Sequence, residues 1–407
     1  MKYSVIFLLM AFCLISGCSK DDMPSGPQNP KAFNLTQKDE QIINISNHFG
    51  INLFRETALA DDGNLMLSPL SASTALTMLL NGCNTETYNQ IRNMLGYDSL
   101  LLDEINNSYK SLVQQLLNLD PETNLALANS AWYRKDFMVK QTYLDQLNNY
   151  FDAKTEALDF NSPSALETIN NWAKDNTNGK IEKVLDNISS DAVMFLMNAL
   201  YFNGNWTYRF DKNKTSLLPF NSENNIATDV EMMRGEFPFR MHSNNNCTAI
   251  EINYGRQNFA MDIIVPKGTL TEYLNELNTG SWQSIIEGLD AIPEPTSAEL
   301  IVPKFRFDYE KYLNDELKAL GMTYAFDPTL ADLSGISDAN IYVSFVKQNT
   351  FVDMNEEGTE AAAVTTVGIY DTSAPLPFIV DKPFIFAIRE RISNTLLFIG
   401  KVELPVY

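Results

Sequence analysis

Histidine is scarce in this chain, and this limits the catalytic chemistry that the sequence supports. Only two histidines are present, His48 and His242. A hydrolase of the triad type needs a histidine beside its nucleophile and a further group that orients the ring. No G-x-S-x-G elbow surrounds a serine. We expect both histidines to be surface or capping residues and the protein not to be an enzyme, although its many carboxylates leave a glycosidase open.

The motifs of metal and nucleotide sites are missing as well. The sequence contains no H-E-x-x-H, C-x-x-C or EF-hand pattern, which would indicate a metal site. It contains neither a P-loop nor a G-x-G-x-x-G segment, which would indicate a bound nucleotide. We therefore expect no metal and no cofactor.

Positive charge is in short supply. The chain has 30 lysines and arginines against 51 aspartates and glutamates, which gives a net charge of −21, and no dense basic run reverses this locally. Polyanions are repelled by such a chain. We expect neither nucleic acid nor a heparin-like glycan as a partner.

The first residues have the pattern of an export signal. Met1-Lys2 is a short basic end, and the apolar run that follows, residues 5–15, is too short to span a bilayer comfortably. The run ends in "LISGC", which resembles the lipobox of bacterial lipoproteins and implies cleavage before Cys18 and lipidation of that cysteine. A plain secretory signal with a chance cysteine is the alternative. We predict a lipoprotein signal peptide over 1–17 and a polar, proline-rich tether over 18–33.

The predicted lipid would attach the protein to a membrane without spanning it. Ser19 after the lipidated cysteine implies the outer membrane in Gram-negative families, and Asp21 and Asp22 loosely resemble the acidic tract of surface-exported lipoproteins. We therefore expect a lipid-anchored protein at the outer membrane or cell surface that faces outward.

The four cysteines do not form a disulfide scaffold. Cys13 lies in the predicted signal peptide and Cys18 is the predicted lipid carrier, so Cys83 and Cys247 remain. An oxidising compartment would permit one bridge between them, but two cysteines cannot staple a fold of this size. We expect both to be free, buried thiols.

Residues 34–407 form one globular unit in composition, with no second linker and no repeats. Ser68-Pro69 predicts a helix start, and residues 105–116 and 169–184 predict further helices, the last interrupted at Gly179. Strands are predicted at 194–202, 250–254, 259–266, 300–307, 378–388 and 395–404. A helix-rich first half and a strand-rich second half indicate an α+β fold.

One late stretch, "NEEGTEAAAVTTVGIYDTSAPLP" at 355–377, has two conformational tendencies. Its first part is a run of small residues and its second part is β-branched and bounded by proline. The stretch is too apolar for a solvated linker. Its start resembles the hinge of the serpin reactive loop, and "FIVDKPFIFAI" (378–388) resembles the family signature that follows that loop.

Further motifs carry the same resemblance in the same order along residues 34–407. They are "NLMLSPLSASTALTMLLNG" (64–82), "INNWAKDNTNGKIEKVL" (169–185), "LMNALYFNGNW" (196–206), "VPKFRFDYEKYLNDELKALGM" (302–322) and "ADLSGIS" (331–337). The loop "NGCNTET" (81–87) departs from the family pattern. The resemblance implies the serpin fold: helices packed on three β-sheets, with a large central sheet and an exposed reactive loop at about 356–377.

The resemblance also implies a function. Serpins offer the loop as bait to a protease, and the cleaved loop then inserts into the central sheet and traps the acyl-enzyme. Accordingly we expect a monomeric suicide-substrate inhibitor whose partner is an extracellular serine, or a papain-type cysteine, protease. The hinge residues it implies are Glu356, Glu357, Gly358, Thr359, Glu360, Ala361, Ala362 and Ala363.

An inserting strand must alternate between two faces. Counted from Thr359, one face holds Thr359, Ala361, Ala363, Thr365, Val367 and Ile369, and the other holds Glu360, Ala362, Val364, Thr366, Gly368 and Tyr370. The first set is small or apolar and suits the buried side. A charge or a proline on that side would stall entry, and none is present.

Counting from the hinge as in the family places the scissile bond between Thr372 and Ser373. A small β-branched Thr372 suits the shallow pocket of elastase-like or subtilisin-like proteases, and the alternative reactive positions are Val367 and Tyr370. No lysine or arginine lies between Lys347 and Lys382, so we expect no trypsin-like target.

Two more family regions match residues here. Ser68, Ser71 and Asn198 match the polar cluster called the shutter, where Gln348 stands at the position of a frequent histidine. Trp206 matches the tryptophan of the breach, the point at which the loop enters, although core packing alone would also explain it. The competing interpretations are a non-inhibitory serpin that binds a ligand or partner, and a surface glycan-binding lipoprotein.

Overall fold

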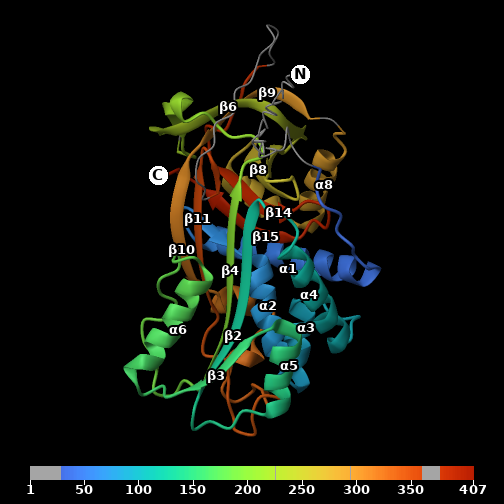
Figure 1. Ribbon diagram of the computed structural model, residues 1–407, viewed down its shortest axis with the longest axis vertical. Helices are drawn as coiled ribbons and strands as arrows, with labels where there is room; N and C mark the ends of the chain where they lie inside the picture. Colours follow the sequence, from blue (N-terminus) through green and yellow to red (C-terminus); the bar gives the residue numbers. More distant parts are fainter. Residues whose placement is uncertain (1–28, 225, 294, 360–375) are drawn as a thin grey trace, which may run out of the picture.

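The computed structural model describes residues 29–224, 226–293, 295–359 and 376–407 (Figure 1). The helices are α1 (Gln37–Ala60), α2 (Pro69–Leu80), α3 (Thr85–Met94), α4 (Leu102–Leu116), α5 (Gln141–Phe151), α6 (Pro163–Asn176), α7 (Leu270–Glu276), α8 (Thr279–Asp290) and α9 (Asn314–Ala319), with short 3-10 turns η1 (Lys212–Lys214) and η2 (Tyr324–Phe326). The strands are β1 (Leu65–Leu67), β2 (Thr123–Arg134), β3 (Lys154–Leu158), β4 (Met194–Asn205), β5 (Ser216–Asn221), β6 (Ala227–Ser243), β7 (Cys247–Tyr254), β8 (Phe259–Pro266), β9 (Thr296–Pro303), β10 (Phe305–Tyr312), β11 (Lys347–Asn355), β12 (Gly358–Thr359), β13 (Phe378–Ile379), β14 (Phe384–Glu390) and β15 (Leu396–Val402).

A tall central sheet organises the molecule. Its strand order is β10-β11-β12-β4-β2-β3, and in Figure 1 it stands upright, with β10 and β11 on the left and β4 and β2 in the middle. The predicted strand at 194–202 is the middle of β4. It is apolar on both faces because both faces of the sheet are covered.

Side chains of β4 alternate between those two covered faces. Phe195 packs with Trp132 and Ile169 in a cluster with residues of α6, which lies at the lower left of the sheet in Figure 1. Met194 and Leu196 instead pack against the main core, to which α2 contributes Leu76 and other residues. The central sheet is thus sandwiched between α6 and the main core.

The remaining strands form two further sheets that share β6. Residues 227–239 of this long strand pair with β5 and β9, and β13 adds to β9. Residues 240–243 pair instead with β7, in a sheet that continues through β8, β14 and β15 to β1. Together with the central sheet this gives the predicted three-sheet α+β architecture.

The structure confirms most element predictions and corrects three. The strand predicted at 300–307 is divided at Lys304 between β9 and β10, which belong to different sheets, and the strand predicted at 378–388 is divided into β13 and β14. A proline, which has no N–H to donate to a ladder, stands at each break: Pro303 and Pro383. The side chain of Ser68 caps α2 by accepting a hydrogen bond from Ser71 N, with Pro69 in the first turn. The helix predicted over 169–184 with a break at Gly179, however, already ends at Asn176. Asn178 and Gly179 have φ angles of +50° and +77°, which an α-helix cannot include.

The polypeptide contacts the domain slightly earlier than the predicted tether boundary at 33. Lys31 N donates to Asn258 Oδ1 at 2.8 Å, and Phe33 is buried.

Cys83 and Cys247 are buried and free, as expected. Among the described residues no helix is both long and apolar enough to cross a membrane. The predicted signal peptide, the lipidation site Cys18 and most of the tether lie outside the described residues.

Candidate functional site

The described part of the predicted hinge, residues 356–359, lies at one end of the central sheet, between two of its long strands. Its two-residue strand β12 pairs with β11, where Asn355 faces Gly358 and Met354 faces Thr359. On the other side it pairs with β4, where Asn205 faces Gly358. Both pairings are antiparallel. In the described part of the sheet, β12 is the only element that joins β4 to β11.

Two cavities continue the path of β12 between β4 and β11. A small one of about 20 Å³ is lined by Thr359 itself, together with Phe202 on β4 and Phe351 on β11. A larger one of about 590 Å³ extends further along. Its walls are residues 194–199 of β4 and residues 340–349 in and before β11, α2 contributes its floor, and residues 184–193 after α6 cover it. The cavity lies in line with β12 and is lined along the lengths of β4 and β11, as expected of a space that could receive a further strand.

Trp206, the predicted breach residue, lies beside β12 and is held there by aromatic and polar contacts. Its indole stacks on Tyr254 with ring centroids 4.3 Å apart, and its Nε1 donates to the Asn355 carbonyl at 2.9 Å. The hydroxyl groups of Tyr254 and Thr359 lie 2.6 Å apart. Burial raises the pKa of Tyr254 well above its usual value, so the phenol is neutral and available for this hydrogen bond. Thr359 therefore points into the interior.

Glu356 and Glu357 of the predicted hinge are buried and paired at this end of the sheet. Glu356 accepts from Thr215 Oγ1 at 2.7 Å and lies 3.4 Å from Lys304 Nζ. Glu357 forms an ion pair with Lys212. The structure thus places these two residues of the predicted loop within the body of the protein rather than in an exposed segment. None of their three polar partners was identified from the sequence.

A glycine is required at position 358 because the backbone of β4 approaches it closely. A Cβ atom built at this position would lie 2.0 Å from the Gly204 carbonyl oxygen on β4. Its φ of +153° is also a value that L-residues avoid. Only glycine fits the step between the buried Glu357 and the inserted Thr359.

The shutter residues Ser68, Ser71 and Gln348 are brought together beneath the sheet. The Gln348 amide makes two hydrogen bonds of 2.9 Å to the Ser68 backbone, accepting from its N and donating to its O. Ser68 Oγ donates to Leu397 O at 2.9 Å and accepts from Ser71 N. Glutamine therefore ties β11 to the start of α2 without a group that titrates near neutral pH.

Asn198, the fourth predicted shutter residue, lies on the opposite wall of the gap. Its Nδ2 donates to Asn129 Oδ1 at 2.6 Å on the neighbouring strand β2. Its own Oδ1 is buried and has no hydrogen-bond partner among the described residues. Asn198 and Gln348 both line the large cavity, so a polar acceptor is left unpaired beside it.

The predicted reactive bond Thr372–Ser373, the alternative positions Val367 and Tyr370, and the remaining hinge residues Glu360, Ala361, Ala362 and Ala363 lie outside the described residues. The chain reappears at Leu376, which is 92% exposed, and Phe378 then pairs in parallel with β9. The segment therefore starts between β4 and β11 and ends at the neighbouring sheet.

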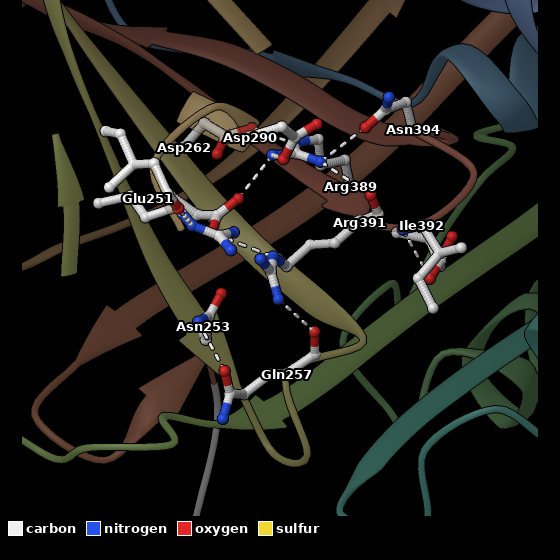
Figure 2. A network of polar contacts seen from close by, with 12 residues as sticks. Glu251, Asn253, Gln257, Asp262, Asp290, Arg389, Arg391, Ile392 and Asn394 are labelled. Carbon is white, nitrogen blue, oxygen red and sulfur yellow. Dashed lines mark hydrogen bonds and ion pairs between the residues drawn. The ribbon is translucent and has the colours of Figure 1, made fainter. Parts of the chain in front are cut away.

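A second polar cluster, whose central residues Arg389, Glu251 and Asp262 are fully buried, has a different character (Figure 2). Arg389 lies 2.6 Å from Glu251 Oε2 and 2.7 Å from Asp262 Oδ2, and Arg391 and Arg240 also contact Glu251. Burial raises the pKa of Glu251 to about 7 and raises that of Asp262, while the Arg389 guanidinium opposes both shifts. The charges are mutually paired between β7, β8 and β14, which is the arrangement of a structural network.

The two histidines, His48 and His242, do not belong to this charge network. His48 is exposed, with Nδ1 2.8 Å from Thr279 Oγ1, and His242 packs against Gly288. Within the described ranges no cluster of three or more histidine, cysteine, aspartate or glutamate side chains is arranged to hold a metal ion.

Comparison with known proteins gives one consistent family. The model of the Serpin (serine protease inhibitor) family matches residues 44–405. The leukocyte elastase inhibitor of Xenopus laevis is 31% identical over 383 residues, covering 90% of this chain and 100% of that protein. The native state of the thermophilic serpin tengpin superposes with a TM-score of 0.81, 31% identity and coverage of 93% and 97% of the two chains. Human thyroxine-binding globulin, solved as a complex with its thyroxine ligand, gives a TM-score of 0.82 at 25% identity, with coverage of 91% and 100%.

Proposed function

Because the chain belongs to the serpin family, we propose that it traps extracellular serine proteases by inserting its cleaved loop into the central sheet. The relatives of the chain support a protease-inhibitor role in general. The protein is in this proposal a stoichiometric inhibitor and not an enzyme. The observation that carries the proposal is the position of β12, which already occupies the first two places of a strand between β4 and β11.

The register of β12 supports the proposal residue by residue. Antiparallel partners advance in opposite directions, so the sixth residue beyond Thr359, Thr365, would face the sixth residue before Gly204 on β4 and the sixth before Met354 on β11. Those two residues are Asn198 and Gln348. Continued insertion would therefore bring the Thr365 hydroxyl to the unpaired Oδ1 of Asn198, which needs a donor.

The facing of the strand agrees with its composition. Thr359 points inward, and side chains two residues apart in a strand share a face. Ala361, Ala363 and Thr365 would therefore enter the buried side, where the floor of the cavity is formed by Ala72, Leu76 and other residues of α2. Small uncharged side chains are those that can enter there at low cost.

The energetics favour insertion strongly. A central strand gains ladder hydrogen bonds on both edges, and a dozen of these at about 0.5–1.5 kcal/mol each are worth on the order of 10 kcal/mol. The intact protein would thus be metastable and held by a kinetic barrier. Cleavage of the loop would remove the constraint that keeps residues 360–372 from following Thr359.

The chemical steps are those of an interrupted acyl transfer. The protease nucleophile attacks the Thr372 carbonyl carbon, the bond to the Ser373 nitrogen breaks, and that nitrogen leaves as an amine with the proton supplied by the protease. An ester then joins Thr372 to the protease. Insertion of the thirteen residues from 360 to 372 at about 3.3 Å each would carry the protease roughly 45 Å before water can hydrolyse the ester. Displacement distorts its oxyanion hole, and the ester persists.

Target class and location are part of the same proposal. The small Thr372 favours elastase-like or subtilisin-like proteases, and a relative is named for inhibition of leukocyte elastase. A lipid on Cys18 would hold the inhibitor at the outer surface of its cell, where such proteases act.

The decisive experiment mixes the mature protein with elastase-, subtilisin-, chymotrypsin-, trypsin- and papain-like proteases and analyses each mixture on a denaturing gel. We expect a band at the summed mass with the elastase- or subtilisin-like enzyme, and release of a peptide that begins at Ser373. A covalent band with the trypsin-like enzyme alone would contradict the assigned specificity. Cleavage without any such band would contradict inhibition.

The alternative is a non-inhibitory serpin that binds a ligand or partner. The similarity to thyroxine-binding globulin and the 590 Å³ cavity favour it. Thermal unfolding before and after cleavage in the loop separates the two functions. An inhibitor gains a large increase in melting temperature because the loop inserts, whereas a binding module that never inserts does not.

A further inference from the structure

The segment that follows β15 returns to the hinge. Arg306 N, at the start of β10, donates to the Val406 carbonyl at 2.7 Å, which fixes the backbone beside the central sheet. The next residue, Tyr407, places its ring centroid 3.9 Å from Lys304 Nζ. An aromatic residue far from the loop in sequence therefore contacts the lysine that pairs with hinge residue Glu356.

The Lys304 ammonium is held between acidic groups under this ring. It lies 3.4 Å from Glu356 and 3.3 Å from Glu231, and only 12% of its side chain is exposed. Partial burial and the neighbouring carboxylate of Asp353 raise the pKa of the Tyr407 phenol. The ring of Tyr407, the Lys304 ammonium and the carboxylate of hinge residue Glu356 therefore form a contiguous set of contacts.

We propose that Tyr407 is a positioning residue for the hinge, whose ring holds the Lys304 ammonium against Glu356 and so keeps β12 seated between β11 and β4. An ammonium beneath an aromatic face is attracted by the ring quadrupole, and the ring also excludes water from the ion pair. A seated β12 is the template from which insertion proceeds in register. The consequence for inhibition rests on the proposed function, but the seating of β12 does not.

The contact is open to substitution because Tyr407 is 53% exposed and its loss removes no core packing. The variants are Tyr407→Phe, which keeps the ring, and Tyr407→Leu and Tyr407→Ala, which do not. Val406→Ala is the matched control, since Val406 is 58% exposed and alanine keeps the carbonyl that accepts from Arg306 N. Lys304→Met tests the partner of the ring.

The first measurement is amide hydrogen exchange of the peptide covering residues 353–359 in the intact protein. We expect Tyr407→Ala and Tyr407→Leu to exchange about threefold to tenfold faster, the factor that a cation–π contact is worth. Tyr407→Phe and Val406→Ala should match the wild type. In the Lys304→Met background, Tyr407→Ala should add nothing.

The second measurement is the number of inhibitor molecules consumed per protease trapped, which should rise in Tyr407→Ala and Tyr407→Leu but not in Tyr407→Phe or Val406→Ala. Unchanged exchange in Tyr407→Ala, an effect of Tyr407→Phe as large as that of Tyr407→Ala, or full retention by Tyr407→Leu would each overturn the inference. If the wild type traps no protease, the proposed function fails and the exchange comparison still decides the role of Tyr407.

Discussion

The neighbouring threonines 365 and 366 provide a matched test of strand insertion. If the loop inserts in the register of β12, Thr365 would enter the buried side, between Asn198 and Gln348, and Thr366 would take the opposite side. We predict that Thr365→Arg converts the protein from an inhibitor into a substrate, while Thr366→Arg remains an inhibitor. The two variants have the same composition and charge, so only the direction of the side chain differs.

The magnitude follows from the surroundings of the gap. Gln348 is 6% exposed and Ser68 is 1% exposed, and the α2 residues that line the cavity are serine, alanine and leucine, without a carboxylate. An unpaired charge buried in such a place costs about 3–5 kcal/mol. If half of this cost is felt in the transition state, insertion slows by roughly tenfold to a hundredfold, which lets deacylation overtake it.

The assay titrates each variant against a fixed amount of the protease that the wild type traps. The ratio of inhibitor consumed to protease trapped should stay near the wild-type value for Thr366→Arg and rise by at least tenfold for Thr365→Arg. The cleaved Thr365→Arg protein should also lack the gain in melting temperature. Equal behaviour of the two variants, or a stronger effect of Thr366→Arg, would refute the insertion register.

Three further predictions concern the structural supports of the site. Gly358→Ala should unseat β12, because its Cβ meets the Gly204 carbonyl, and should raise hydrogen exchange of residues 353–359 more than Gly179→Ala does at a glycine with open surroundings. Gln348→Ala should destabilise the intact protein by about 2 kcal/mol, since two buried backbone groups of Ser68 lose their partners, and thermal unfolding measures this loss. Arg389→Met should cost about 3–5 kcal/mol at pH 8. Without the cation, the pKa values of its buried carboxylate partners rise further, so these groups take up protons in the folded state as the pH falls. The variant should therefore be more stable at pH 5 than at pH 8, relative to the wild type. Unfolding measured at these two pH values checks this, and a variant that recovers no stability at pH 5 would contradict the pairing.

Local sequence patterns predicted those parts of the fold that depend on neighbouring residues. The continuous apolar run of β4 and the Ser68-Pro69 helix start were read correctly because burial on two faces and helix capping each have a local signature. The end of α6 was predicted incorrectly. The helical sequence pattern continues beyond Asn178 and Gly179, but these two residues adopt left-handed conformations that end the helix before them. Alternation in 250–254 indicated a strand but not that Glu251 would be fully buried among arginines.

The site itself was only partly predictable. The resemblance pointed to the hinge and shutter positions, whereas the partners of the hinge come from distant elements. Thr359 meets Tyr254, and Glu356 meets Thr215 and Lys304. Such contacts leave no periodic signal in the sequence, since they depend on how β7, the residue before β5 and the residue between β9 and β10 converge on the hinge. The unpaired Oδ1 of Asn198 could likewise be recognised only from the structure, which shows β4 and β11 separated by a cavity at this position.

The attachment of Lys31 has a topographical consequence for a lipid-anchored inhibitor. Lys31 is bonded to Asn258, and in the same turn Gly255 N donates to the carbonyl of Asn205, the partner of Gly358. The polypeptide therefore departs for its proposed anchor beside the upper mouth of the gap. A captured enzyme that travels along the gap would end at the opposite pole of the molecule, farther from the bilayer than the place where it was caught.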